Sequence, residues 1–332
     1  MRKAQRKRVV ASFVILIFLL IAFASIYALS FIFGLKTDNL GGGKQPAKNE
    51  SLNILVVGMD IGDVDQEGNQ IIPPVLLDHF TAVLPKGFVS LVGPNAVGKS
   101  TLLLLASGRL LPQEGCITLL GRDTATLDEI TKNNIASFIY QNMEFDTEDI
   151  LEDILHSVYD SGNFQGKHPA LSGSFQGIHS SLQEDTSDLF DQIVRIFDLK
   201  PLFAHKLTGL SKGEMQRVIL AFSLLYGSES IFMDEPLFAL EQPHKHVALA
   251  YIKAYSRQLH ITIYMAMHEL ELNRKYPDKV LLIYPNKNMD LGTPEEVLLP
   301  ESLEKAYGVP AAMLKDAESL SRKALMEQYQ AE

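Results

Sequence analysis

One stretch decides the fold: Gly93-Pro94-Asn95-Ala96-Val97-Gly98-Lys99-Ser100-Thr101. It follows an apolar, β-prone run, Phe88 to Val92, and precedes a helix-favouring run, Leu102 to Ala106. Glycines in such a loop let backbone N–H groups turn inward around phosphate oxygens, while a lysine adds a point charge and a serine hydroxyl ligates Mg²⁺. The sequence therefore predicts a strand, a loop that binds the β- and γ-phosphates of a nucleotide, and a helix.

A pair of acidic residues ends another apolar run, Ser230 to Met233, downstream of this loop. Asp234 suits Mg²⁺, and Glu235 suits the water that attacks a phosphoryl group. Adjacent acids at the end of a strand also occur as caps of a following helix. The position of the pair, before a further apolar run that leads to His268, favours the catalytic interpretation.

Other patterns are ambiguous when each is taken alone. Ser211, with Glu214 three residues later, is typical of a capping box that begins a helix, which we expect to continue to about Tyr226. Gln141 follows an apolar run, and taken alone this position favours the polar end of a strand. His268, which is followed by an acidic residue, is equally the start of a capped helix.

In order and approximate spacing, these motifs resemble those of ATP-binding cassette (ABC) ATPases, and the resemblance covers residues 71–310. It implies an α/β fold, a P-loop NTPase with a mixed sheet core and an inserted α-helical subdomain. Gly93 to Thr101 look like the Walker A loop, which holds ATP. Asp234 looks like the Walker B acid, which holds Mg²⁺ together with Ser100, and Glu235 looks like the catalytic base.

The same resemblance assigns the remaining site residues. Gln141 looks like the glutamine that joins Mg²⁺ sensing to a membrane partner, and His268 looks like the switch histidine. Ser211, Gly213 and Glu214 look like the signature loop, which in one subunit closes over the γ-phosphate held by the other. The implied catalytic residues are thus Glu235, His268 and Gln141, and the implied Mg²⁺ ligands are Ser100, Gln141 and Asp234.

This sequence departs from the family pattern at several positions. Ala96 stands where a glycine is common, which we expect to be tolerable with a negative φ. Lys212 replaces the first of the two signature glycines, and Glu241 replaces the usual aspartate of the D-loop, Ala239 to Glu241. Upstream, we expect both the first strand and the adenine-stacking aromatic of the family to be missing, because residues 66–70 contain no aromatic side chain.

Several flanking segments look like importer subunits that serve iron-siderophore, haem or cobalamin permeases. They are Gly108 to Gly115, Leu120 to Asp123, Gly292 to Val297 and Tyr307 to Pro310. This resemblance implies a homodimer or a paired nucleotide-binding subunit, an integral membrane permease as partner and, indirectly, a solute-binding protein. The net charge of −10 and pI near 5.4 argue against broad nucleic-acid binding.

The N-terminus begins with basic residues, followed by an uncharged apolar run over 9–35. At about 1.5 Å per residue this run exceeds the roughly 30 Å hydrocarbon core, so it predicts a single transmembrane helix. A cleaved signal peptide is the alternative, although its apolar region usually has about 7 to 15 residues. Farther on, Asn53 to Asp60 resemble the opening of LytR-CpsA-Psr proteins, but the later arginine and aspartate motifs of that family have no counterpart here.

These observations predict a division of the chain into parts. The expected parts are a basic start and transmembrane helix (1–35), a linker with the short LytR-CpsA-Psr-like stretch (36–70), the ABC ATPase domain (71–310) and a charged C-terminal helix (311–332). Within the ATPase domain we expect a helical subdomain over about 146–225. Its Gly- and Ser-rich part, 161–181, is expected to be a loose insertion.

The two ends of the chain predict opposite locations. An ABC ATPase domain is expected at the cytoplasmic side of the cell membrane, whereas basic residues before a first span would send the following domain outside. Three explanations of this conflict are open: the apolar segment does not span the membrane, the orientation rule fails for this protein, or the chain joins two unrelated pieces. We favour the third. A non-transport ABC ATPase and a membrane-anchored wall glycopolymer transferase stay open as alternative functions.

Overall fold

The computed structural model describes residues 52–56, 63–64, 70–71, 80–141, 143, 145, 147–173, 175 and 188–314. All of them belong to the second of two compact units, Pro46–Glu332. The transmembrane helix expected over 9–35 and most of the helix expected over 311–332 lie outside the described residues. Within the ranges described, we find no helix with the length and apolar character that a membrane span needs.

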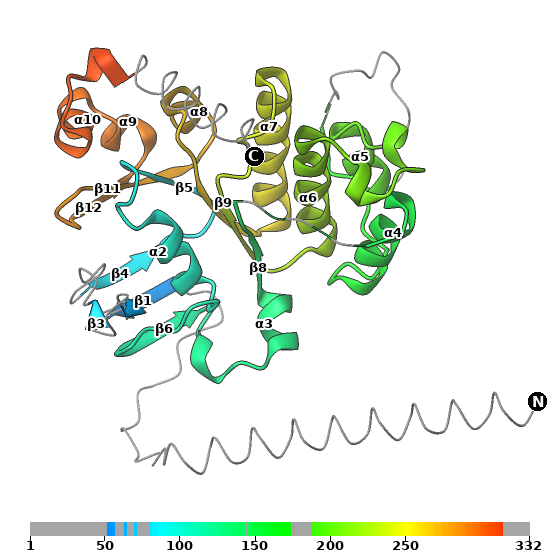
Figure 1. Ribbon diagram of the computed structural model, residues 1–332, viewed down its shortest axis with the longest axis horizontal. Helices are drawn as coiled ribbons and strands as arrows, with labels where there is room; N and C mark the ends of the chain where they lie inside the picture. The colour runs from blue at the N-terminus through cyan, green and yellow to red at the C-terminus, as the bar shows by residue number, and fades with distance from the viewer. Residues whose placement is uncertain are drawn as a thin grey trace, which may run out of the picture. The chain divides into compact units, whose positions relative to one another are not determined.

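A six-stranded sheet forms the centre of this unit, in the order β12-β11-β5-β10-β9-β8. Neighbouring strands from β11 to β8 are parallel, and β12 pairs antiparallel with β11, so the predicted mixed sheet is confirmed (Figure 1). The bounds are β5 Phe88–Val92, β8 Ala136–Ile139, β9 Ser230–Asp234, β10 Thr262–Ala266, β11 Lys279–Ile283 and β12 Met289–Gly292.

Alternate side chains of these strands enter different cores, as the two-residue period of a strand requires. On β9, Ile231 and Met233 pack with α6 (Lys212–Tyr226) and α7 (Gln242–Leu259), whereas Phe232 packs with α2 (Lys99–Ala106). On β10, Ile263 and Met265 likewise belong to the core with α6 and α7, and Tyr264 and Ala266 belong to the core with α2. Strands that are buried on both faces need near-continuous apolar sequence, which is why these runs stand out.

A second, four-stranded sheet has the order β4-β1-β6-β7 and contributes to the core around α2. Its strands are β1 Leu52–Val56, β4 Phe80–Leu84, β6 Gly115–Leu119 and β7 Arg122–Asp123. β1 pairs antiparallel with both β4 and β6, so the expectation that the first strand is missing was wrong. Strand pairing uses backbone groups, which any apolar, β-prone segment supplies, so the apolar run Leu52–Val56 can fill this position. Two short strands, β2 Asp63–Val64 and β3 Gln70–Ile71, pair with each other.

The predicted helical subdomain is built from α4 Leu151–Ser161, α5 Leu189–Ile196 and α6, with 3₁₀ turns at Lys200–Leu202 and Leu207–Gly209. α6 begins after Ser211, whose side chain and that of Glu214 form the predicted capping box, and it ends at Tyr226 as expected. All three helices contribute to the larger core, together with α7.

Two residues of the Gly- and Ser-rich segment, Leu171 and Ser172, have backbone groups that are held by side-chain amides. Gln192 accepts a hydrogen bond from Leu171 N (2.8 Å) and donates one to Leu171 O (3.1 Å). Gln258 forms the same pair of bonds with Ser172, at 2.9 and 2.8 Å. Composition could not predict this, because the amides that satisfy the segment's backbone lie elsewhere in the sequence.

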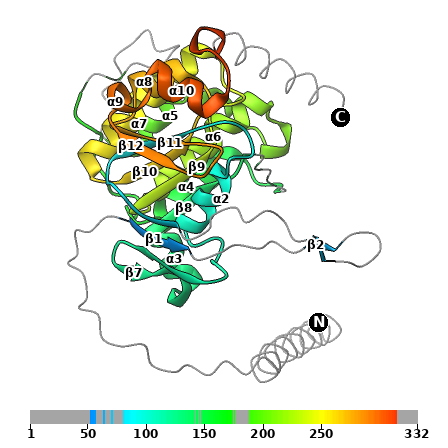
Figure 2. The same cartoon turned by 90° about the vertical axis from the view of Figure 1, so that its left-hand side faces the viewer.

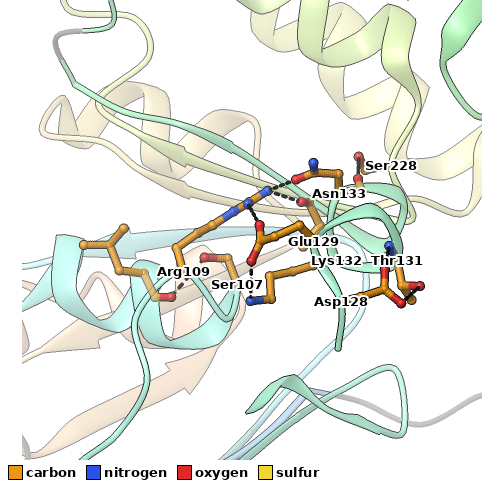
Figure 3. A network of polar contacts seen from close by, with 10 residues as sticks. Ser107, Arg109, Asp128, Glu129, Thr131, Lys132, Asn133 and Ser228 are labelled. Atoms are coloured by element: carbon orange, nitrogen blue, oxygen red, sulfur yellow. Dashed lines mark hydrogen bonds and ion pairs between the residues drawn. The ribbon is translucent and has the colours of Figure 1, made fainter. Parts of the chain in front are cut away.

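Arg109, which follows α2, connects that helix to α3 (Glu129–Ile135) and β8. Its guanidinium donates to Asn133 Oδ1 (2.6 Å) and to the Ala136 carbonyl (3.0 Å), and it lies 3.6 Å from the Glu129 carboxylate (Figure 3). The Ser228 hydroxyl donates to the Asn133 carbonyl from the turn before β9. These bonds connect the segment after α2 with α3 and with the beginnings of β8 and β9.

The C-terminal part of the described chain packs on β11 through a third core. Its elements are α8 Leu270–Lys275, α9 Pro294–Val297, α10 Pro300–Tyr307 and a 3₁₀ turn at Ala311–Met313. Another 3₁₀ turn, Thr124–Thr126, lies between β7 and α3. Figure 2 shows α8, α9 and α10 close together beside β11 and β12, at the top of the view. β1 and α3 lie at the bottom of the same view, beyond β8.

Alanine substitutions at three glycines would distinguish the cost of a left-handed backbone from the cost of a steric clash of the added Cβ. Gly227 ends α6 with φ 71°, and an added Cβ would lie 2.4 Å from the Phe164 ring. Gly308 ends α10 with φ 70°, and an added Cβ there would meet no atom within 4 Å. Gly209 has neither a left-handed backbone nor an atom within 4 Å of an added Cβ. We expect Gly209→Ala to change the free energy of unfolding by less than about 1 kcal/mol, Gly308→Ala to lower it by about 1 kcal/mol, and Gly227→Ala to lower it by about 2 kcal/mol or more. Urea denaturation tests this order, and equal losses for Gly227→Ala and Gly308→Ala would contradict it.

Candidate nucleotide-binding and catalytic site

The predicted strand, loop and helix are confirmed: β5 ends at Val92 and α2 begins at Lys99. Gly93 has φ 154°, and an added Cβ would lie 2.6 Å from the carbonyl oxygen of Ile283 on β11. Gly98, with φ 110°, caps α2. Both positions therefore require glycine. Between and beyond them, Pro94 is half-buried, Asn95 and Ala96 are exposed, Val97 is buried, Ser100 is exposed and Thr101 is half-buried.

Ala96 adopts φ 59°, so the expectation of a negative φ was wrong. The turn of the loop requires a left-handed residue here, which explains why glycine is common at this position. An alanine in this conformation costs about 1–2 kcal/mol. Since Ala96 is exposed, its Cβ points away from the packed core and the strain stays local.

The Lys99 side chain lies back inside the loop that precedes it. It is 6% exposed, and its ammonium donates to the carbonyls of Gly93 (2.8 Å) and Pro94 (2.9 Å). Burial lowers the pKa of Lys99, while the nearby carboxylates of Glu235 and Asp234 act in the opposite direction. The loop therefore holds a positive charge in place before any anion binds.

Asp234 ends β9 and contacts the first turn of α2. Its carboxylate is hydrogen-bonded by the Ser100 side chain, and burial raises the pKa of Asp234 from its ordinary value. One carboxylate oxygen, Oδ1, is buried and has no hydrogen-bond partner among the described residues. A carboxylate with a spare oxygen beside a hydroxyl is the oxygen donor set that Mg²⁺ prefers.

The described residues contain no cluster of three or more His, Cys, Asp or Glu side chains that could hold a metal ion alone. Mg²⁺ commonly takes one or two carboxylates from the protein and the rest of its ligands from water and substrate phosphates. Ser100 and Asp234, next to the phosphate loop, fit that arrangement.

Glu235 lies between the two other predicted catalytic residues. The Gln141 side-chain amide donates to Glu235 Oε2 (2.9 Å), and His268 Nε2 contacts Glu235 Oε1. Gln141, Glu235 and His268 follow β8, β9 and β10 respectively, so they meet at the carboxyl edge of the sheet, where ligands bind in such folds. Glu235 itself has φ 51°, a left-handed conformation that is strained for a non-glycine residue.

The signature residues form a separate group at the start of α6. Glu214 N donates to Ser211 Oγ (3.3 Å), and Ser211 N donates to the Glu214 carboxylate (2.8 Å). These bonds with Ser211 lower the pKa of Glu214. The Glu214 carboxylate thus caps the helix, and a Cβ on Gly213 would lie 3.2 Å from the Ala239 carbonyl of the D-loop.

Sequence reasoning missed side chains that support the site. Lys287, in the turn between β11 and β12, donates to the Val97 carbonyl of the phosphate loop (3.2 Å). Lys245, which is buried on α7, forms an ion pair with Glu269, the residue after His268. Neither lysine lies in a motif, and only a contact between distant parts of the chain reveals it.

Comparison with known proteins agrees with this geometry. Residues 80–238 match the family model described as ABC transporter. A hemin import ATP-binding protein HmuV from Idiomarina loihiensis is 30% identical over 67% of this chain and 81% of its own length. A petrobactin import ATP-binding protein FpuC from Bacillus anthracis is 26% identical over 69% of this chain and 80% of its own length.

The cobalamin import ATP-binding protein BtuD from Halobacterium salinarum is 26% identical over 76% of this chain, which spans only 59% of that relative's length. Among solved structures, a dimeric ATP-binding cassette in a post-hydrolysis state, bound to ADP and phosphate, has a TM-score of 0.56 at 18% identity. It covers 73% of this chain and 98% of its own. At that identity the likeness concerns the fold. Together, the family match and the hemin-import relative establish that the chain belongs to the ABC transporter family, whose ATP-binding subunits hydrolyse ATP.

Proposed function

We propose that this chain hydrolyses ATP to power an importer for an iron-siderophore, haem or cobalamin-like solute. The observation that carries the proposal is the position of Glu235, which contacts both Gln141 and His268 and directly follows the Asp234 that bonds Ser100. The solute class rests on the printed functions of the similar proteins, which import cobalamin, petrobactin and hemin.

ATP binding falls to the phosphate loop. Backbone N–H groups from Gly93 to Thr101 surround the β- and γ-phosphates, and the Lys99 ammonium leaves its two carbonyl partners for phosphate oxygens. Ser100, Asp234 and the Gln141 side chain would hold Mg²⁺. When bound, the ion neutralises charge on the phosphates.

Hydrolysis depends on positioning and on electrostatics. Glu235 accepts a hydrogen bond from the attacking water and aligns it with the γ-phosphorus. His268 contacts the same carboxylate and fixes the orientation of the Glu235 side chain. It also donates toward the charge that develops on the transferring phosphoryl group. The base must exchange the Gln141 contact for the water, so nucleotide entry is expected to rearrange that bond.

We further propose that two ATP-binding subunits act together, as a homodimer or a mixed pair. Ser211 and Gly213 of one subunit would then cover the γ-phosphate held by the other, with the exposed Lys212 beside them. A permease would contact the surface near Gln141, and a solute-binding protein would act indirectly. Copurification with an integral permease separates this proposal from a non-transport ATPase.

Location follows from the same proposal. The ATPase domain is placed at the cytoplasmic face of the cell membrane, and the apolar run 9–35 serves as an additional anchor. Its charge pattern favours the opposite orientation, in keeping with a composite origin of the LytR-CpsA-Psr-like start and the ATPase domain. Protease protection of a C-terminal tag in spheroplasts distinguishes the two orientations.

Glu235→Gln should preserve ATP binding and lower turnover by about 10²–10⁴-fold, because an amide of equal size cannot act as the base. Steady-state phosphate release measures turnover, and titration with a fluorescent ATP analogue measures binding. Glu229→Gln is the matched control, since Glu229 is exposed just before the other end of β9. Unchanged hydrolysis by Glu235→Gln would reject the catalytic assignment.

Asp234→Asn should lower the affinity for ATP in Mg²⁺ by about tenfold or more, whereas the affinity in EDTA should stay within about twofold. The replacement keeps the size of the side chain but removes the charge that the metal needs. The measurement is a pair of fluorescent-nucleotide titrations. Equal losses with and without Mg²⁺ would point to damaged packing and contradict the metal assignment.

Lys99→Ala should weaken nucleotide binding itself by about 10- to 100-fold, as expected for the loss of a charge-assisted hydrogen bond worth about 1.5–3 kcal/mol. Lys86→Ala removes an exposed lysine just before β5 and serves as the control. Fluorescent-ATP titration compares the two variants, and similar affinities for both would remove Lys99 from the phosphate site.

A further inference from the structure

The turn that carries His268, residues 267–269, is held by a side chain from α7. Lys245 is 1% exposed, and its ammonium forms an ion pair with the Glu269 carboxylate. The Gln242 amide donates to the other oxygen of the same carboxylate (2.7 Å). Glu269 therefore has polar partners on α7 for both of its oxygens.

A second side chain holds the backbone of the same turn from α8. Asn273 is fully buried, and its amide nitrogen donates to the carbonyls of Met267 (3.2 Å) and Glu269 (2.9 Å). These carbonyls lie on either side of His268. The peptide units Met267–His268 and Glu269–Leu270 are thus fixed by one amide group.

Neither residue is explained by packing alone. A buried lysine is costly unless it is paired, and an apolar side chain of similar volume would join α7 to its neighbours at no such cost. Buried polar networks of this kind restrict a segment to a single arrangement. Here the segment is the one whose imidazole must touch Glu235 Oε1.

We propose that Lys245 and Asn273 are positioning residues for ATP hydrolysis, which hold the 267–269 turn so that His268 contacts Glu235. Lys245 acts through the Glu269 carboxylate, and Asn273 acts through the carbonyls of Met267 and Glu269. Because α7 begins directly after Glu241, the same contact joins the D-loop to the switch histidine. This inference rests on the proposed roles of Glu235 and His268.

The test compares Lys245→Met, Glu269→Gln and Asn273→Leu in the full chain. A displacement of the histidine by about 1 Å is expected to lower kcat by about 10- to 100-fold. The KM for ATP and the affinity for a fluorescent ATP analogue should stay within about twofold, because the phosphate loop is untouched. The double variant Lys245→Met with Glu269→Gln should lose no more than Lys245→Met alone, since both act on one pair.

Arg257→Met is the matched control, because Arg257 lies on the same helix and pairs with Asp278 instead. It should leave kcat and KM unchanged. If Lys245→Met does not fold, the nearly isosteric Glu269→Gln and Asn273→Leu carry the test, with retained nucleotide affinity as evidence of folding. A kcat within twofold of the parent for both, or a KM that changes in step with kcat, overturns the inference when Glu235→Gln is inactive. Full activity of Glu235→Gln overturns the proposed function and the inference together.

Discussion

In the six-stranded sheet, Leu91 on β5, Ala266 on β10 and Asp234 on β9 are register partners across parallel strands. This pairing brings the phosphate loop, the acid pair and the turn with His268 to the same edge. A shift of one residue in either ladder would turn every side chain of a strand to the opposite face. The burial of β5, β9 and β10 on both faces prevents such a shift and thereby fixes the geometry of the site.

Sequence was sufficient where the determining interactions are local. The glycines of the phosphate loop, the capping box of Ser211 and Glu214, and the apolar strands were all predicted, because each depends on neighbours within a few residues. The conformation of Ala96 was not, since the turn of the loop overrides the preference of a single residue. The hydrogen bonds that hold Leu171 and Ser172 also escaped prediction, because Gln192 and Gln258 make them from other helices.

The candidate site shows the same division between local and distant determinants. Motifs identified the residues that end the strands, including Gln141, whose contact with Glu235 joins parts of the chain far apart in sequence. Lys245, Asn273 and Lys287 belong to no motif and have ordinary sequence surroundings. Their partners lie on other elements, so only the assembled fold distinguishes them from surface or core residues of the same type.

The interior position of β1 also determines where the chain can be cut. A fragment that starts at residue 71, where the family pattern begins, would lack β1 and leave the facing edges of β4 and β6 without partners. Open strand edges recruit strands from other molecules and lead to aggregation. A fragment of the ATPase domain that keeps this sheet complete must therefore begin upstream of Leu52.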